Sequence, residues 1–102
     1  MLNAKEELLE AVKDTAKIKC ASITYRRWEK EVSKKALKLN HTNDEYNEFL
    51  NSLDFIYDSG YGSQELYGTV WLEDNTWLSR GEYYGAEWWK HNTSPDIPSE
   101  CL

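Results

Sequence analysis

The fold is decided by the run Leu66-Tyr-Gly-Thr-Val-Trp-Leu-Glu-Asp-Asn-Thr-Trp-Leu-Ser-Arg-Gly-Glu-Tyr83. Aromatic and aliphatic residues recur with period two on both sides of Asp74-Asn75, a pattern typical of two strands joined by a tight turn. Asn is the best residue other than Gly where a turn needs a positive φ. The run therefore predicts a β-hairpin whose two loop residues are Asp74 and Asn75.

This register assigns each side chain of the hairpin to one of two faces. It pairs Leu72 with Trp77 on one face and Thr69 with Arg80 on the other. Trp77 is then expected in the core, beside an apolar partner, with Trp71 on the opposite face. Because both faces carry aromatic residues, we expect one to meet the helices and the other to be covered or used by a partner.

Two segments that precede the hairpin are predicted to be helices. Asn3 and Glu6 form the first capping pattern, and Thr42-Asn-Asp-Glu45 forms a second. Each is followed by apolar residues at helical spacing, which predicts one buried stripe per helix. The stripes are Ala4, Leu8, Ala11 and Val12, then Tyr46, Phe49, Leu50 and Leu53.

The remaining segments complete a single domain, residues 1–102. Residues 17–25 and 54–58 are rich in strand formers, whereas residues 26–40 fit either a helical stripe or the return strand of a hairpin, which we favour. Residues 90–102 contain both prolines and are expected to form an extended, irregular tail. The order α-β-β-α-β-β-β predicts an α+β fold with a mainly antiparallel sheet and two helices on one face.

The charge is divided unevenly along the chain. Residues 1–40 carry ten Lys/Arg and six Asp/Glu, whereas residues 41–102 carry two Lys/Arg and twelve Asp/Glu. An acidic half repels phosphate backbones, so this pattern favours a basic protein surface as partner and disfavours nucleic acid. The chain also lacks a long apolar run and an apolar signal segment, so we expect a cytoplasmic protein that does not enter a membrane.

No pattern of residues points to catalysis or to a cofactor. The histidines and the two cysteines show no metal-ligand spacing, and no glycine-rich loop precedes a helix. We therefore expect a protein that is not an enzyme. The basic stretch around Arg26-Arg-Trp-Glu-Lys30 is interpreted as a solvated edge strand, with a patch for nucleic acid or an acidic partner as the alternative.

The aromatic residues point instead to a binding surface. Trp88 and Trp89 cannot both point inward on an extended chain, so one should be exposed or lie under the tail. Exposed tryptophans are frequent hot spots of interfaces. We expect an acidic aromatic surface for a protein partner, with homodimerisation as a competing use. Its residues are Tyr67, Trp71, Glu73, Arg80, Glu82, Tyr84, Glu87 and Trp88.

A small-ligand site is the alternative reading of the same residues. In it, the aromatic rings stack on a planar or sugar ligand while Arg80 holds an anionic group.

The hairpin, with Gly85-Ala-Glu-Trp-Trp89 and Pro95-Asp-Ile-Pro98, resembles small accessory proteins of unknown activity encoded by tailed bacteriophages. The resemblance covers residues 43–98. It departs at Asn75, where the related turn has Gly, and at Tyr84, where an acidic residue is usual. The resemblance implies a compact phage accessory protein that acts in the bacterial cytoplasm. By analogy with other small acidic phage proteins, we expect an inhibitor that docks on a host or defence protein.

Overall fold

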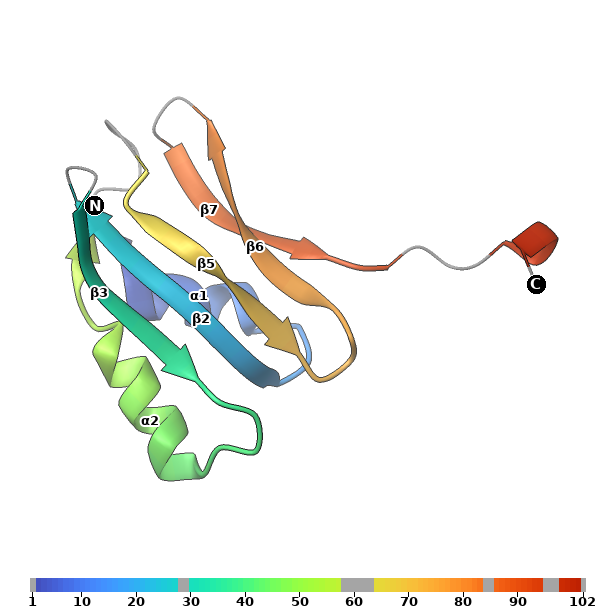
Figure 1. The fold of residues 1–102 in the computed structure, drawn as a ribbon, viewed down its shortest axis with the longest axis horizontal. Coiled ribbons are helices and arrows are strands. Elements are labelled where there is room, and N and C mark those ends of the chain that lie inside the picture. Colours follow the sequence, from blue (N-terminus) through green and yellow to red (C-terminus); the bar gives the residue numbers. More distant parts are fainter. Residues whose placement is uncertain (1, 28–29, 58–63, 84–85, 95–97, 102) are drawn as a thin grey trace.

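The computed structural model describes residues 2–27, 30–57, 64–83, 86–94 and 98–101 (Figure 1). These residues form seven strands, two α-helices and a final 3-10 turn. In chain order they are β1 (Leu2–Asn3), α1 (Ala4–Val12), β2 (Ile18–Arg27), β3 (Lys30–Leu37), α2 (Asn43–Ser52), β4 (Ile56–Tyr57), β5 (Leu66–Leu72), β6 (Trp77–Tyr83), β7 (Ala86–Asn92) and η1 (Ser99–Cys101).

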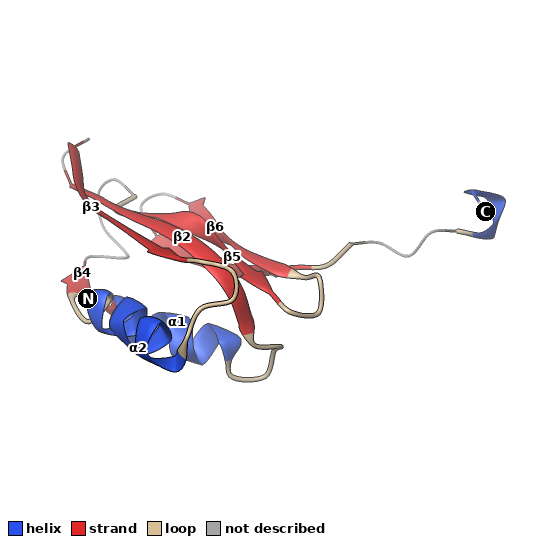
Figure 2. Ribbon diagram, turned by 60° about the horizontal axis from the view of Figure 1, so that its bottom comes forward, coloured by secondary structure: helices blue, strands red, loops and turns tan. Residues whose placement is uncertain are grey.

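The described strands form a five-stranded antiparallel sheet in the order β3-β2-β5-β6-β7, beside a small β1–β4 pair. Figure 2 shows α1 and α2 together on one side of the large sheet. The α+β prediction, with a mainly antiparallel sheet and two helices on one face, is confirmed.

Local capping starts both helices where the sequence predicts. The Asn3 side chain accepts from the Glu6 backbone N–H at 3.1 Å, and Thr42 and Glu45 make both bonds of a capping box. The predicted stripes face the core: Leu8 is 0% exposed, and the end of the second stripe is buried as well. In the described part of the chain, neither helix has the length or apolar composition to cross a bilayer.

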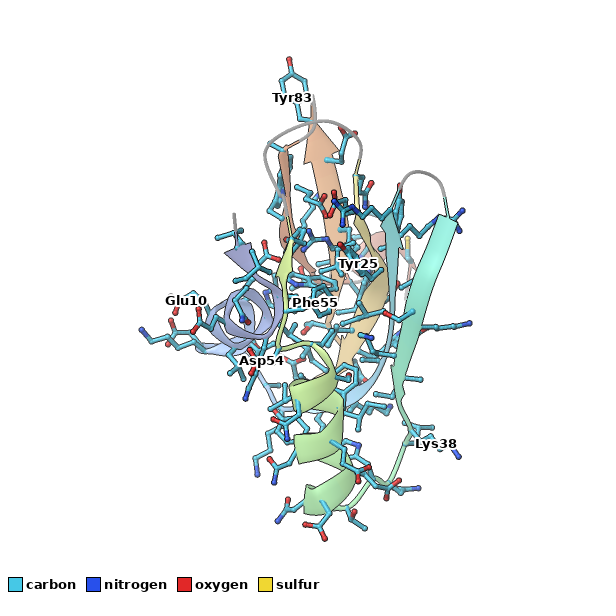
Figure 3. The ribbon with its side chains drawn as sticks, turned by 90° about the vertical axis from the view of Figure 1, so that its left-hand side faces the viewer. Glu10, Tyr25, Lys38, Asp54, Phe55 and Tyr83 are labelled. Atoms are coloured by element: carbon cyan, nitrogen blue, oxygen red, sulfur yellow. The ribbon has the colours of Figure 1, made fainter. Side chains whose placement is uncertain are left out.

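The hairpin reading of residues 26–40 is confirmed. Strand β3 returns along β2, with Ala21 opposite Leu37 and Tyr25 opposite Ser33. Tyr25 packs against Phe55 with ring centroids 4.8 Å apart, and Figure 3 shows the two residues side by side beyond the end of α2. The contact joins β2 to the segment that follows α2.

The turn of the central hairpin differs from the prediction by one residue. It holds three residues, 73–75, because Leu72 N donates to Thr76 O at 2.9 Å and Trp71 pairs with Trp77. A two-residue turn would hold both Asp74 and Asn75 left-handed, at about 1–2 kcal/mol for a residue other than Gly. The three-residue turn needs this conformation at Asn75 alone, whose φ is 66°.

This one-residue shift moves the β6 side chains to the opposite face. Val70 now pairs with Leu78, which is 1% exposed, and Thr69 pairs with Ser79 instead of Arg80. The prediction that Trp77 lies in the core is therefore wrong, since Trp77 stands beside Trp71 on the face away from the helices.

The last strand, β7, is missing from the predicted order of elements, which ends with the second strand of the central hairpin. β7 pairs with β6 from Tyr83 opposite Ala86 to Trp77 opposite Asn92. The strand thus continues past residue 90, where an irregular tail was expected, because the free edge of β6 supplies hydrogen-bond partners to this segment.

Candidate binding surface

The side of the large sheet opposite α1 and α2 is a face built by strand alternation. We call it the open face. Its described residues are Cys20, Ser22, Thr24 and Arg26 of β2, Lys34 and Ala36 of β3, Tyr67, Thr69 and Trp71 of β5, Trp77, Ser79, Gly81 and Tyr83 of β6, and Ala86, Trp88, Lys90 and Asn92 of β7.

Large aromatic side chains on this face are exposed. Tyr67 is 38% exposed, Trp71 44% and Trp88 43%, and Tyr83 reaches 67% at the tip of β6, where Figure 3 shows it pointing outward. Trp77 is partly buried beside Trp71. The expectation that one of Trp88 and Trp89 is exposed is confirmed, since Trp89 packs against the core on the other face.

The open face is not acidic. Its charged described side chains are Lys34 and Lys90, which are exposed, and Arg26, which is partly buried at the end of β2. Strand alternation places Glu82 and Glu87 on the helix side, because each neighbours an open-face residue in sequence. The predicted combination of these glutamates with the aromatic rings in one surface is therefore wrong.

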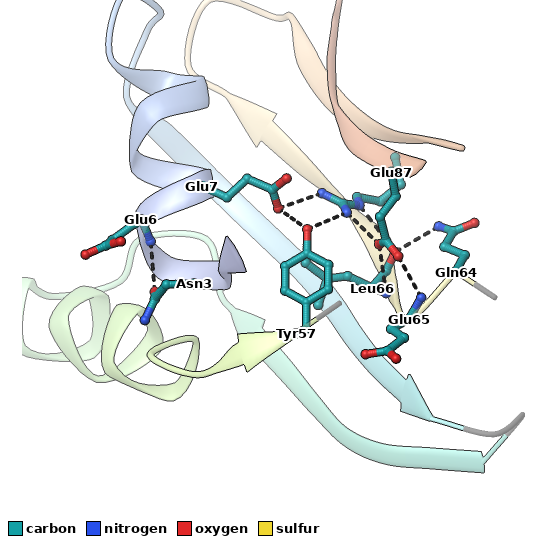
Figure 4. Close-up of polar contacts among 9 residues, drawn as sticks. Asn3, Glu6, Glu7, Tyr57, Gln64, Glu65, Leu66 and Glu87 are labelled. Atoms are coloured by element: carbon teal, nitrogen blue, oxygen red, sulfur yellow. Dashed lines mark hydrogen bonds and ion pairs between the residues drawn. The ribbon is translucent and has the colours of Figure 1, made fainter. Parts of the chain in front are cut away.

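Arg80 also points to the helix side, where it forms a buried charge cluster (Figure 4). Its Nη1 donates to Glu7 Oε1 at 3.1 Å, and its Nη2 donates to Glu87 Oε1 at 2.6 Å and to the Tyr57 hydroxyl at 2.9 Å. Tyr57 donates in turn to Glu7. The side chains of Arg80 and Glu87 are 3% and 0% exposed.

This cluster replaces part of the β5–β6 ladder. The paired residues end at Thr69 and Ser79, and beyond them side chains bond the backbone of Leu66. Arg80 Nε donates to Leu66 O at 3.2 Å, while Glu87 accepts from the backbone N–H groups of Leu66 and Glu65 at 3.1 and 2.9 Å. Figure 1 shows the β6–β7 hairpin diverging from β5 in this region.

Within this cluster Arg80 keeps its charge and Tyr57 keeps its phenol proton. Burial lowers the pKa of Arg80, but Glu7, Glu87 and Tyr57 outweigh this effect and raise it above its ordinary value. Burial, followed by the hydrogen bond to Glu7, raises the pKa of Tyr57 well above its ordinary value, against the opposing effect of Arg80. The guanidinium stacks 4.7 Å from the Trp89 ring centroid.

Arg80 therefore cannot serve as the anion contact of a ligand stacked on the exposed rings. It lies on the opposite side of the sheet, and both its charge and its donors are engaged within the protein. The hypothesis of a small-ligand site is therefore left without its predicted anion contact.

The eight residues predicted for the surface are thus separated. Tyr67, Trp71 and Trp88 lie on the open face, Glu73 is exposed in the hairpin turn, and Tyr84 lies outside the described residues. The other three, Arg80, Glu82 and Glu87, lie on the helix side.

Sequence reasoning missed Trp77, Tyr83, Lys34 and Lys90 as open-face residues. The signal that could have found Trp77 and Tyr83 is the three-residue turn, because counting by two from Trp77 leads to Tyr83 once the register is right.

A metal site and a cavity were the other candidate binding features of the described residues. The described His, Cys, Asp and Glu side chains form no group of three that could hold a metal ion. A cavity of about 360 Å³ beside the ends of both helices includes His41, Tyr46 and Glu73 in its lining, but none of the exposed rings of the open face. Comparison with protein-family models, curated proteins and solved structures finds no match for this chain.

Proposed function

We propose that this protein is a non-enzymatic binding protein that engages its partner through the open face of the five-stranded sheet. The observation that supports this most is the exposure of Tyr67, Trp71 and Trp88 on one face. Single exposed apolar residues are ordinary in proteins, but several large rings on one face are characteristic of interaction sites.

The strands that carry these rings pack against the hydrophobic core on their other side. Ile23, Val70 and Leu78, at 0–1% exposure, lie on the helix side of the same strands. Rings fixed on a packed sheet lose little conformational freedom on binding, which favours affinity. A partner can therefore dock on this face without rearrangement of the core.

The resemblance of residues 43–98 to small phage proteins suggests a biological setting. In it, the protein acts in the bacterial cytoplasm as an inhibitor that docks on a host or defence factor. The composition suggested a basic partner surface, but Lys34 and Lys90 beside the rings fit a partner surface that is acidic or neutral.

Capture from bacterial lysate tests this function. The wild-type chain is expected to retain a partner that the double variant Trp71→Ala/Trp88→Ala loses, because both substitutions remove exposed ring area. The matched control is Leu9→Ala, which removes an exposed apolar side chain from α1 on the helix side and should leave capture unchanged.

Two results would contradict the proposal. One is equal capture by the wild type and the double variant. The other is sedimentation as a dimer that the same double variant converts to a monomer, since the occupant of the face would then be a second copy of the chain. Thermal unfolding should first confirm that each variant is folded.

A further inference from the structure

The open face differs in charge from the molecule as a whole. The chain has a net charge of −6, yet the charged described side chains that strand alternation places on the open face are the cations Lys34, Lys90 and, at the end of β2, Arg26. Acidic side chains are exposed instead on the outer surfaces of α1 and α2, including Glu10, Glu45 and Glu48. The argument from overall charge against an anionic partner does not apply to the open face, because the sheet and its core separate the two sets.

Side chains on the open face are arranged in rows that cross the strands. The central row runs Ala36, Ser22, Thr69, Ser79 and Lys90, so three hydroxyl groups lead to a lysine. A second row holds Trp71 and Trp77 and ends at Asn92. The third row places Lys34 beside Thr24, which pairs with Tyr67.

The rings are spaced along the strands so that they can serve different units of a chain-like ligand. Tyr67 and Trp71 are four residues apart on β5, a separation of about 13 Å at the usual rise per residue. Trp88 stands on another strand, against Gly81. Rings separated in this way, with short hydroxyl side chains between them, suit a polymer better than one small molecule.

From this arrangement we propose that the open face binds single-stranded nucleic acid. The proposal rests on the proposed function and names the partner of the same face. Tyr67, Trp71 and Trp88 stack on unpaired bases, Lys34 and Lys90 neutralise phosphates, and the hydroxyl row donates to phosphate or sugar oxygens. In a duplex the base faces already stack on one another, so these rings select a single strand.

Fluorescence anisotropy with a labelled oligodeoxythymidine of about a dozen nucleotides tests the proposal, since one sheet face covers about this length. The wild type is expected to bind the single strand, and the matching duplex to compete poorly. Trp71→Ala and Trp88→Ala should each weaken binding by roughly tenfold, as expected for loss of one stacked base.

Because two lysines contact phosphates in this proposal, the affinity for the oligonucleotide should depend only weakly on salt concentration. Two phosphate contacts give a slope of about −1.4 in a plot of log affinity against log salt concentration. Lys34→Gln and Lys90→Gln should each reduce this slope by about half. The matched control Lys13→Gln removes an exposed cation just after α1 and should change neither the slope nor the affinity.

Heparin, a polyanion without bases, separates stacking from simple charge attraction. Weak competition by heparin supports the proposal. Competition by heparin as strong as by the unlabelled oligonucleotide, or binding that is unchanged in Trp71→Ala and Trp88→Ala, overturns it.

The two proposals can fail separately. Absence of oligonucleotide binding, with lysate capture of a protein that still depends on Trp71 and Trp88, overturns the nucleic-acid proposal and leaves the proposed function standing. Absence of both overturns both. Oligonucleotide binding that depends on these rings supports the nucleic-acid proposal and the open face as the binding surface, and it replaces the protein partner with a single strand.

Discussion

The indole of Trp88 lies so close to Gly81, its partner across β6 and β7, that a β-carbon at position 81 would come within 2.5 Å of two of its ring atoms. Gly81 has no unusual backbone conformation to explain its presence, since its φ is outside the left-handed range. The glycine is there to leave room for the ring. It thereby fixes the position of Trp88 on the open face.

The effect of Gly81→Ala on the free energy of unfolding should therefore have opposite signs in the wild type and in a Trp88→Ala variant. In the wild type it should lower the free energy of unfolding by about 1 kcal/mol, because the indole must move. In a Trp88→Ala background the same substitution should raise the free energy of unfolding by about 0.5–1 kcal/mol, because Ala restricts the unfolded chain. Urea unfolding of the four proteins in this double-mutant cycle measures the coupling, and equal effects in both backgrounds would contradict it.

Gly68→Ala should lower the free energy of unfolding far more than Gly81→Ala does. Gly68 has a φ of 141°, and a β-carbon there would lie 2.2 Å from the backbone oxygen of Ser22 on the adjacent strand. A backbone atom within a sheet cannot turn aside as an exposed indole can. We expect a loss of about 3 kcal/mol or more in the free energy of unfolding, measured in urea. A loss no larger than that of Gly81→Ala would show that β2 and β5 can separate locally.

Glu87→Gln should destabilise the fold strongly. The substitution removes the buried carboxylate that lies 2.6 Å from Arg80 Nη2, and it leaves that cation with Glu7 as its remaining charged partner. Loss of one member of a buried ion pair typically costs about 3–5 kcal/mol. Chemical unfolding measures this cost.

Glu10→Gln is the matched control for Glu87→Gln. Glu10 is an exposed residue of α1 that points away from the body of the molecule in Figure 3. Its substitution should shift stability by about 0.5 kcal/mol or less. Similar effects of the two substitutions would mean that Glu7 and Tyr57 alone suffice to hold Arg80.

Stability should fall in alkaline solution because of Tyr57. Its pKa in the folded protein is raised above the ordinary value of 10.0, so the folded state keeps the phenol proton longer than the unfolded state. The contribution is complete below pH 10 and is lost as the pH rises through the folded pKa. Within this range the free energy of unfolding should fall by about 1.4 kcal/mol per pH unit from this group.

Tyr57→Phe should remove that part of the slope, whereas Tyr83→Phe, at an exposed position, should leave it. Urea unfolding at a series of pH values above 9 provides the comparison. Tyr25 adds to the decline in both variants, because burial and Glu65 also raise its pKa. An unchanged slope in Tyr57→Phe would show that the phenol ionises as readily in the folded protein as in the unfolded chain.

Local chemistry explains what could be predicted from the sequence. The Thr42–Glu45 capping box and the stripe that follows it act within a few residues, so the start and buried side of α2 were correctly predicted. Strand alternation in the central hairpin is equally local, and it correctly placed Trp71 on the face opposite Val70 and Leu72, whereas which tryptophans are exposed could not be predicted. These patterns also sufficed for the α+β class.

The composition of the candidate site depended on contacts between distant residues. Arg80 and Glu7 are far apart in sequence, and no local pattern in either segment shows that the fold brings them to 3.1 Å. The register of the turn decided which face Arg80 occupies. A shift of one residue there reverses every side chain of the strand.

By itself, the sequence determined both helices, the β2–β3 hairpin and the central hairpin, because caps, apolar periodicity and turn residues act between near neighbours along the chain. Only the tertiary structure decided that the glutamates of β6 and β7 lie behind the sheet and that lysines accompany the exposed rings in front of it. The reason is physical: the face on which a strand residue lies is fixed by hydrogen bonds to partner strands, and those partners come from remote parts of the chain.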